Sequence, residues 1–293
     1  MTGTSQVAIV GVGNMGGGMA INLLRRGWQV HVHDIDMARQ RALKDLGAVP
    51  HDSAGAAAVQ AATTIVAVVN AEQCQDVLFG RGGVAARAQL GHTVLLCPTM
   101  GPQDCEVIAT RLRPLGLHCV DAPMSGGPDR AANGSMSLMV ACADHVFQRQ
   151  QVLLQALSSR LFRIGEKVGD GARTKLVNNL AAAINLVGAA EVLALAQQLG
   201  LDPARTLDVI EQSSGQSWIG SDRMRRAIHG DYAPRAHMTL LEKDTRLAMQ
   251  AATDAGFHGP LGGTVRDVFA SASAAGLASQ DDAALLKWLT RPG

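Results

Sequence analysis

Short runs rich in β-branched residues alternate with helix-length segments over the first half of the chain. The strand-like runs are Gln6–Val10, Gln29–Asp34, Thr64–Val69, Thr93–Cys97, Leu117–Asp121, Ser137–Cys142 and Leu161–Ile164. Between them lie segments with helical character at Met15–Arg26, Met37–Leu46, Ser53–Ala62, Glu72–Phe79, Gln103–Leu112 and Asp144–Leu157. Strands separated by helix-length crossovers form parallel sheets with helices on both faces. The sequence therefore predicts an α/β fold that begins with a Rossmann-type, doubly wound parallel sheet.

The pattern changes after about Gly165, where strand-like runs disappear. Helices are predicted at Ala172–Leu199, Pro203–Ser213, Ser217–His229, Leu240–Ala255, Leu261–Ala275 and Asp281–Leu289. Gly200 ends the first of these, and Asp202-Pro203 begins the next with an N-cap and a proline in the first turn. The prediction is two domains, residues 1–165 and 166–293, the second all helical and joined to the first by a long helix.

Composition and charge exclude several classes of protein. Lys plus Arg number 26 and Asp plus Glu 25, so the chain lacks the excess of cations that nucleic-acid binding requires. The five cysteines form no Cys-x-x-Cys pair, which favours reduced thiols in a cytoplasmic protein. The N-terminus shows no secretory signal, and the apolar window 180–196 contains Asn185 and Glu191, which argues against a membrane span. The nine histidines show no metal-binding spacing, so no metal is expected.

The segment Gly11-Val12-Gly13-Asn14-Met15-Gly16 matches the fingerprint of dinucleotide-binding proteins. It follows a predicted strand and opens a predicted helix, which is the context that the fingerprint needs. Gly11 permits the tight turn, Gly13 lets a pyrophosphate approach the backbone, and Gly16 lets helix and strand pack closely. The alternative is a glycine-rich turn without a ligand.

An acidic residue, Asp34, closes the next strand 18 residues after Gly16. Its carboxylate would accept hydrogen bonds from the adenine ribose and would repel a 2′-phosphate. The first cation that follows is Arg39. We therefore expect NAD rather than NADP.

Two further segments have the composition of a substrate site. Ser125-Gly126-Gly127 follows a strand at the carboxyl edge of the sheet, where a hydroxyl group and successive backbone N–H groups could bind a carboxylate. Lys175 and Asn179 lie one turn apart near the start of a nearly uncharged helix. A lysine in a dry cleft would have its ammonium form disfavoured and could act as an acid or base. Taken alone, these residues also fit a plain loop and a solvated surface lysine, and Lys243-Asp244 fits a surface ion pair.

In combination, these residues resemble the β-hydroxyacid dehydrogenase family, which includes 3-hydroxyisobutyrate dehydrogenase and tartronate semialdehyde reductase. The resemblance covers nearly the whole chain and is carried by the segments Gly11–Gly16, Asp121–Gly127, Ala132–Gly134, Gly169–Gly171, Lys175–Asn179 and Lys243-Asp244. It implies that Lys175 and Asn179 are catalytic and that Ser125, Gly126 and Gly127 bind substrate. It also implies cofactor contacts from Val69, Asn70, Thr99 and Lys243, in addition to the fingerprint and Asp34.

Within the family, two stretches favour oxidation of a four-carbon sugar acid such as L-threonate. They are Val68–Ala71 with Val77–Gly80, and Ser217-Trp218 with Arg223-Met224 and Gly230–Tyr232. Ser217 and Trp218 are expected to line the substrate pocket. The Ala-rich helical half would expose apolar surface if left alone, so a homodimer or homotetramer through this domain is expected.

Other readings of the sequence remain open. Within the family, the substrate could be 3-hydroxyisobutyrate, tartronate semialdehyde or succinic semialdehyde. A dinucleotide-sensing binding protein would need no lysine and asparagine at helical spacing. Imine reductases share the architecture but usually lack the lysine, so Lys175 argues against them.

Overall fold

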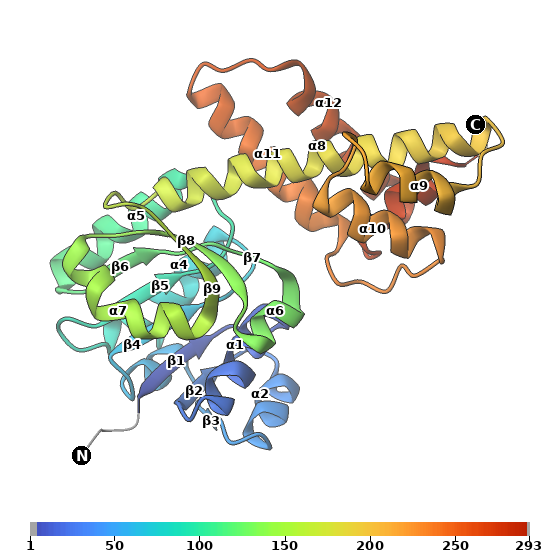
Figure 1. Ribbon diagram of the computed structural model, residues 1–293. Coiled ribbons are helices and arrows are strands. Elements are labelled where there is room, and N and C mark those ends of the chain that lie inside the picture. Colours follow the sequence, from blue (N-terminus) through green and yellow to red (C-terminus); the bar gives the residue numbers. More distant parts are fainter. Residues whose placement is uncertain (1–4, 292–293) are drawn as a thin grey trace. The chain divides into compact units, whose positions relative to one another are not determined.

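A computed structural model describes residues 5–291. The chain separates into two compact units, one ending at Lys175 and the other beginning at Leu176. Figure 1 shows a sheet with flanking helices in the first unit and a group of helices in the second. The division lies inside helix α8 (Asp170–Gln198) rather than at residue 165, because this helix continues from one unit into the other. The prediction of no secretory signal concerns in part residues 1–4, which lie outside the described residues.

One mixed sheet forms the centre of the first unit. Its strands run in the order β3-β2-β1-β4-β5-β6-β8-β7, and β9 pairs with β8. They are β1 (Gln6–Val10), β2 (Gln29–His33), β3 (Val49–Pro50), β4 (Thr63–Val66), β5 (Thr93–Leu96), β6 (His118–Asp121), β7 (Met124–Ser125), β8 (Met136–Ala141) and β9 (Ser158–Gly165). The predicted doubly wound fold is confirmed for β1 to β6, which are parallel.

Beyond β6 the sheet is no longer purely parallel. Strand β8 runs antiparallel to both β6 and β7, and only β9 is again parallel to its neighbour. The chain turns back after β6 through a short strand and a short helix, α6 (Gly127–Asn133), instead of crossing over the sheet. The next long strand therefore enters the sheet in the opposite direction.

Both faces of the sheet are covered because successive strand residues point to opposite sides. On one face, Ile9 belongs to an apolar cluster shared with α1 (Asn14–Arg25), α2 (Met37–Lys44), α6 and α7 (Asp144–Leu157). On the other face, Val10 belongs to a cluster shared with α3 (Ala54–Ala58), α4 (Ala71–Phe79) and α5 (Pro102–Leu112). In sheets of this kind, ligands bind at the loops that follow the carboxyl ends of the parallel strands.

Three short elements, β3, β7 and α6, are absent from the sequence prediction. A strand of two residues has no alternation that a sequence pattern can detect. Helix α6, in contrast, carries a signal in the sequence, since Pro128 lies in its first turn and Gly134 ends it in a left-handed conformation.

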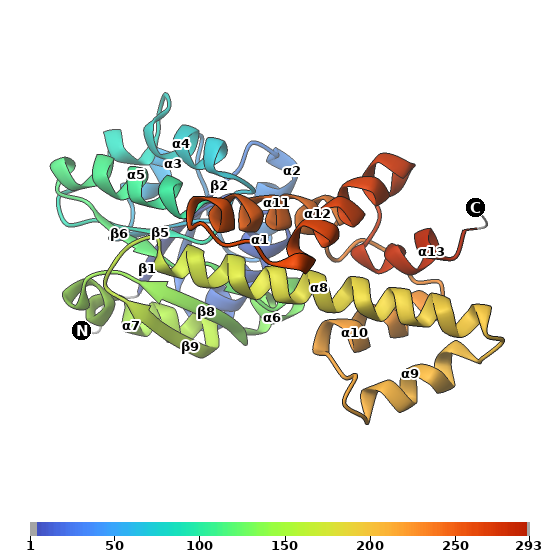
Figure 2. The same ribbon diagram turned by 90° about the horizontal axis from the view of Figure 1, so that it is seen from above.

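The second unit consists of helices packed around Phe269, Leu186, Met224 and Leu285. Figure 2 shows them from above, with α8 running along the group. Besides the second part of α8, they are α9 (Pro203–Glu211), α10 (Trp218–Ile228), α11 (Met238–Asp254), α12 (Pro260–Ala272) and α13 (Leu285–Leu289). The predicted helical domain is confirmed, with each of these helices within a few residues of its predicted bounds.

A fully buried carboxylate, Asp281, ties the helical unit together. It accepts hydrogen bonds from Arg226 Nη2 at 2.8 Å and from the backbone N–H groups of Arg235 and Ala236 at 2.8 and 3.1 Å. Burial raises the pKa of Asp281, but these hydrogen bonds outweigh burial and lower it to about 2. The carboxylate therefore stays charged at neutral pH and connects α10 to the segment that precedes α11.

The five cysteines are free thiols, and all except the half-buried Cys119 are buried. Burial raises the pKa of Cys97 to about 12 and that of Cys142 to about 11. These thiols are protonated at neutral pH and are unreactive, as the sequence indicated.

Helix α8 is long and apolar enough to cross a membrane by length and composition, although 44% of its most apolar stretch is buried inside the protein. Core helices of soluble proteins share these properties. Apolar side chains that remain exposed on it include Val177, Val192 and Leu195, at 71%, 45% and 56% exposure.

Candidate functional site

The glycine fingerprint connects the end of β1 to the start of α1. Gly11 has a φ of +85°, which favours glycine. A Cβ atom on Gly16 would lie 1.9 Å from the carbonyl oxygen of Gly11, so no other residue fits there. Gly13 precedes α1 and has no side chain to cap its first N–H groups. The helix therefore presents unshielded N–H groups, as a diphosphate requires.

Asp34 lies beside this loop, as expected. Its Oδ2 atom accepts a hydrogen bond from Val12 N at 2.6 Å, and its Oδ1 atom accepts one from Asp36 N at 2.8 Å. The carboxylate of Asp34 is thus held in one orientation before a ribose binds. The glycine loop and the Asp34 carboxylate together fit the adenosine half of a nicotinamide dinucleotide.

Arg39 also reaches the loop, and sequence reasoning assigned it no role. Its Nη1 atom lies 2.8 Å from the position that a Cβ atom on Gly13 would occupy, and its Nε atom pairs with Asp36 at 3.2 Å. Asp36 and Arg39 are three residues apart at the start of α2, and residues at this spacing share a helix face. This spacing could have predicted their ion pair from the sequence.

The other predicted cofactor residues of the first unit follow two neighbouring parallel strands. Val69 and Asn70 follow β4, and Thr99 follows β5, which pairs with β4. The side chain of Asn70 caps α4 by accepting a hydrogen bond from Gln73 N at 2.9 Å, while Val69 is 54% exposed. The structure thus brings these residues to the same edge of the sheet as the glycine loop.

The segment Ser125-Gly126-Gly127 lies at the junction of β7 and α6 rather than in a plain loop. Gly126 and Gly127 have φ values of +136° and +77°, which residues with a Cβ atom rarely adopt. The two glycines therefore allow a backbone turn next to the Ser125 hydroxyl that other residues would not permit.

Asp121, at the end of β6, holds the start of α8. Its Oδ2 atom accepts hydrogen bonds from Gly169 N at 2.8 Å and from Ala172 N at 3.0 Å, and the residue is only 1% exposed. Burial raises the pKa of Asp121 to about 6, although the backbone hydrogen bonds act in the opposite direction. Asp121 therefore positions the start of α8. From the sequence it was identified only as the first residue of the segment Asp121–Gly127.

Lys175 and Asn179 lie one turn apart on α8 and are 7% and 8% exposed. Asn179 Nδ2 donates to Asp244 Oδ2 at 2.6 Å, and Lys243 Nζ lies 3.0 Å from Asp244 Oδ1. Asp244 is itself 6% exposed, so its charge is compensated by these two partners. Asp244 thus connects Asn179, which is predicted to be catalytic, with Lys243, which is predicted to contact the cofactor.

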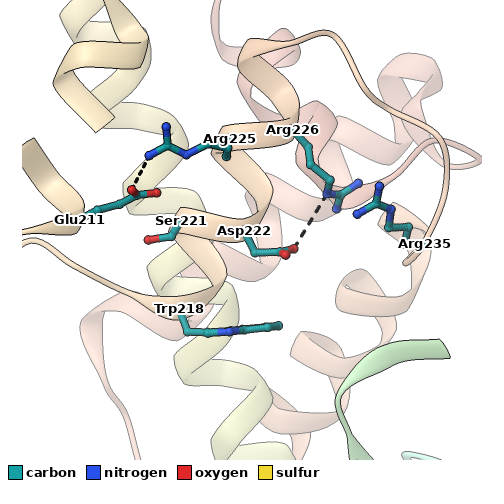
Figure 3. A pocket seen from close by; sticks show the side chains of 7 residues that line it. All are labelled: Glu211, Trp218, Ser221, Asp222, Arg225, Arg226 and Arg235. Atoms are coloured by element: carbon teal, nitrogen blue, oxygen red, sulfur yellow. Dashed lines mark hydrogen bonds and ion pairs between the residues drawn. The ribbon is translucent and has the colours of Figure 1, made fainter. Parts of the chain in front are cut away.

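Ser217 and Trp218 differ in what their side chains do. The Ser217 hydroxyl caps α10 by accepting a hydrogen bond from Gly220 N at 3.1 Å. The Trp218 side chain is 57% exposed and lines a cavity of the helical unit, shown in Figure 3. Among residues 5–291, no group of three or more His, Cys, Asp or Glu side chains is placed to hold a metal ion.

Comparisons with known proteins agree with this arrangement. Residues 6–165 match the model of the NAD binding domain of 6-phosphogluconate dehydrogenase. Residues 169–289 match the model described as NAD-binding of NADP-dependent 3-hydroxyisobutyrate dehydrogenase.

Full-length relatives point to the same group of enzymes. The chain is 36% identical to L-threonate dehydrogenase of Escherichia coli K12 over 98% of this chain and 96% of that protein. It is 32% identical to 3-hydroxyisobutyrate dehydrogenase of Pseudomonas aeruginosa over 90% and 91% of the two chains. A crystal structure of 3-hydroxyisobutyrate dehydrogenase from Salmonella typhimurium superimposes with a TM-score of 0.90, at 35% identity over 97% and 99% of the chains. The chain belongs to the β-hydroxyacid dehydrogenase family, and is an oxidoreductase of the 3-hydroxyisobutyrate dehydrogenase type with binding domains for a nicotinamide dinucleotide.

Proposed function

We propose that the protein oxidises a small hydroxy acid, with NAD as hydride acceptor and Lys175 as the group that carries the proton. The observation that carries this proposal is the burial of Lys175 on α8, one turn from an asparagine that is itself fixed by Asp244. A basic group that is held in place and shielded from water can take a proton from a substrate hydroxyl and return it.

The reaction divides between a hydride and a proton. The bound dinucleotide supplies the acceptor for the hydride that leaves the carbinol carbon of the substrate. Lys175 Nζ takes the hydroxyl proton as the C–O bond becomes a carbonyl, and it returns a proton in the reverse direction. Asn179 orients the reacting hydroxyl, and its link to Asp244 keeps the amide from rotating.

Cofactor binding is assigned to Gly11, Gly13, Asn14, Met15, Gly16, Asp34, Val69, Asn70, Thr99 and Lys243. The choice of NAD over NADP is supported by Asp34, whose carboxylate would lie against the 2′-phosphate of NADP. Like charges in direct contact cost several kcal/mol, so the kcat/KM ratio of the two cofactors should favour NAD by at least about tenfold. Asp34→Ser should reduce this ratio, whereas the exposed Asp52→Ser, on the loop after β3, should leave it unchanged.

The preferred substrate is L-threonate, a four-carbon hydroxy acid. This choice is supported by the relatives named L-threonate dehydrogenase at 34–36% identity. The family resemblance at Ser217-Trp218, described above, favours the same substrate. Ser125, Gly126 and Gly127 are proposed to bind the substrate carboxylate through the hydroxyl and backbone N–H groups. The helical domain is proposed to carry Ser217 and Trp218 at the substrate and to form a homodimer or homotetramer, covering exposed apolar residues such as Val192 and Leu195.

A panel of acids tests the proposed function. Reduction of NAD and of NADP would be followed at 340 nm with L-threonate, D-erythronate, 3-hydroxyisobutyrate and glycerate. The expected result is the highest kcat/KM with L-threonate and NAD. A preference for 3-hydroxyisobutyrate or for NADP would contradict the specific assignment, and no turnover of any acid would contradict the reaction class.

A further inference from the structure

The helical unit contains a cavity of about 400 Å³, a size within the range of small-molecule sites. It is lined by Glu211 of α9, by Trp218, Asp222, Arg225 and Arg226 of α10, and by Arg235 in the segment that precedes α11. We call it the arginine pocket. Trp218, proposed above to contact the substrate, lines this pocket, whereas Lys175, Asn179 and Ser125 do not.

Arg226 is a buried cation with unused hydrogen-bond donors. Its side chain is only 9% exposed, and Nη2 donates to Asp281 at 2.8 Å. The Nε and Nη1 atoms have no hydrogen-bond partner among residues 5–291, and the carboxylate nearest to Nε, that of Asp222, is 3.9 Å away. Because buried N–H groups are almost always paired, these donors indicate a ligand with acceptor oxygens.

A second guanidinium faces the first. Figure 3 shows the side chains of Arg226 and Arg235 pointing toward one another in the pocket. Arg235 pairs with Asp231 at 3.2 Å, yet its side chain remains 53% exposed. Arg225 is different, because Glu211 and Asp208 already pair with it. Two facing guanidinium groups attract an anion, and a carboxylate matches their planar geometry.

The remaining lining residues restrict the chemistry of that anion. The lining contains three arginines and two acids, Glu211 and Asp222. Arg226 and Arg235 also pair with Asp281 and Asp231, so a ligand would be held by the unused N–H donors of the guanidinium groups rather than by an excess of positive charge. The two lining acids and the Ser221 hydroxyl can accept hydrogen bonds from hydroxyl groups of a ligand. The exposed indole of Trp218 offers an apolar face to a short carbon chain.

We propose that the arginine pocket binds a small hydroxylated monocarboxylic acid, with its carboxylate between Arg226 and Arg235 and its carbon chain against Trp218. The choice of a four-carbon acid as the probe rests on the proposed function. The pocket itself is defined by residues of the helical unit only.

Binding of L-threonate to the full-length protein by isothermal titration calorimetry, without dinucleotide, tests the proposal. The titrations are made with the wild-type protein and in a Ser125→Ala background, and the arginine pocket accounts for the binding that persists in Ser125→Ala and depends on Arg235. Arg235→Gln should weaken this binding by about tenfold or more, because it removes one charge-assisted pair. The matched control is Arg266→Gln, an exposed arginine of α12 paired with its neighbour Asp267, which should change the affinity less than twofold. Arg235 is chosen because Arg226 also supports Asp281 and its loss could unfold the unit.

Ligand analogues and fluorescence complete the test. Threitol lacks the carboxylate and butyrate lacks the hydroxyls, so both should bind more weakly than L-threonate by about tenfold. L-threonate should change the tryptophan emission of the protein, and Trp218→Phe should abolish that change. Equal binding to the Arg235→Gln protein, no binding at all, or tighter binding of inorganic phosphate would each overturn the proposal. The two proposals can fail separately. If the protein oxidises L-threonate but Arg235→Gln leaves binding unchanged, only the proposed ligand of the arginine pocket is wrong. If binding depends on Arg235 but no acid is oxidised, only the proposed function is wrong.

Discussion

Two buried aspartates, one in each unit, show how differently the two halves of this chain are held together. Asp121 and Asp281 are 1% and 0% exposed, and both accept several hydrogen bonds. Asp121 accepts hydrogen bonds from the backbone N–H groups of Gly169 and Ala172, and burial raises its pKa to about 6. Asp281 has in addition the guanidinium of Arg226, and its pKa is lowered to about 2. A full positive charge outweighs the cost of burial, whereas backbone dipoles reduce that cost without cancelling it.

The same contrast applies to the candidate sites. In the sheet unit, the backbone places the glycine loop, Asp34 and Thr99 at the ends of neighbouring strands. In the helical unit, polar and charged side chains far apart in sequence meet, as Asn179 and Asp244 or Arg226 and Asp281 do. Mutations should therefore separate binding of the dinucleotide at the glycine loop from proton transfer and from stability, which depend on buried side chains.

The largest expected effect is that of Lys175→Ala on turnover. Loss of a general acid or base lowers kcat by about 10²–10⁴-fold, whereas the glycine loop remains intact and the affinity for NAD should change less than twofold. Stopped-flow or steady-state assays with L-threonate, together with NAD titration, would measure both quantities. The control is Lys167→Ala, an exposed lysine paired with Glu106. If kcat survived the change, the separation of cofactor binding from proton transfer would fail.

The next largest effect compares the two aspartates directly. Asp281→Asn removes the charged partner of a buried arginine and should lower the free energy of unfolding by about 3–5 kcal/mol. Asp121→Asn keeps an oxygen that can accept backbone hydrogen bonds and should cost less than about 2 kcal/mol. Urea unfolding at pH 8, followed by circular dichroism, gives both values. Equal losses would show that the guanidinium contributes nothing beyond the backbone.

The pH dependence of stability should distinguish the same residues with a smaller effect. Between pH 3.8 and about 6, folded Asp121 keeps a proton that the unfolded chain has released, so stability falls as pH rises through this window. The shift corresponds to about 3 kcal/mol. The free energy of unfolding of wild type relative to Asp121→Asn should therefore decrease from pH 4 to pH 7. For Asp281 the sign is opposite, because its lowered pKa makes stability rise as the pH increases from 2 to 3.8. If the difference in unfolding free energy between wild type and Asp121→Asn did not change with pH, the pKa of Asp121 would not be raised.

The smallest expected effect concerns Arg39, which lies over the glycine loop. Removal of one exposed cation near a diphosphate should raise the dissociation constant of NAD by about twofold to fivefold, because exposed ion pairs contribute less than 1 kcal/mol. Arg39→Gln would be compared with Arg41→Gln, a neighbouring exposed arginine of α2. An unchanged affinity in both variants would mean that the backbone alone determines binding of the diphosphate.

The sequence predicted those features that depend on neighbours along the chain. Strands β1, β2, β4, β5 and β6, the glycine loop and the helix with Lys175 follow from local periodicity and from turn residues, and their positions agree with the structure. Asp34 could be placed near the loop because strands β1 and β2 are parallel neighbours.

Features that depend on distant residues could not be predicted in this way. The reversal of β8 depends on how a short turn packs, and no periodicity records it. The link between Asn179 and Asp244 spans 65 positions, and that between Arg226 and Asp281 spans 55. The run Arg223-Met224-Arg225-Arg226 is typical of a solvated helix face, and the burial of Arg226 becomes visible only when the helices are assembled.

The continuity of α8 has a consequence for variation at this position of the chain. An α-helix advances by about 100° per residue. A single inserted residue between Lys175 and Asn179 would therefore swing the amide a quarter turn or more away from the amine, and a compensating deletion elsewhere could not restore the alignment. Tolerance to insertions should consequently drop sharply within these four positions and recover toward the end of the helix near Gly200.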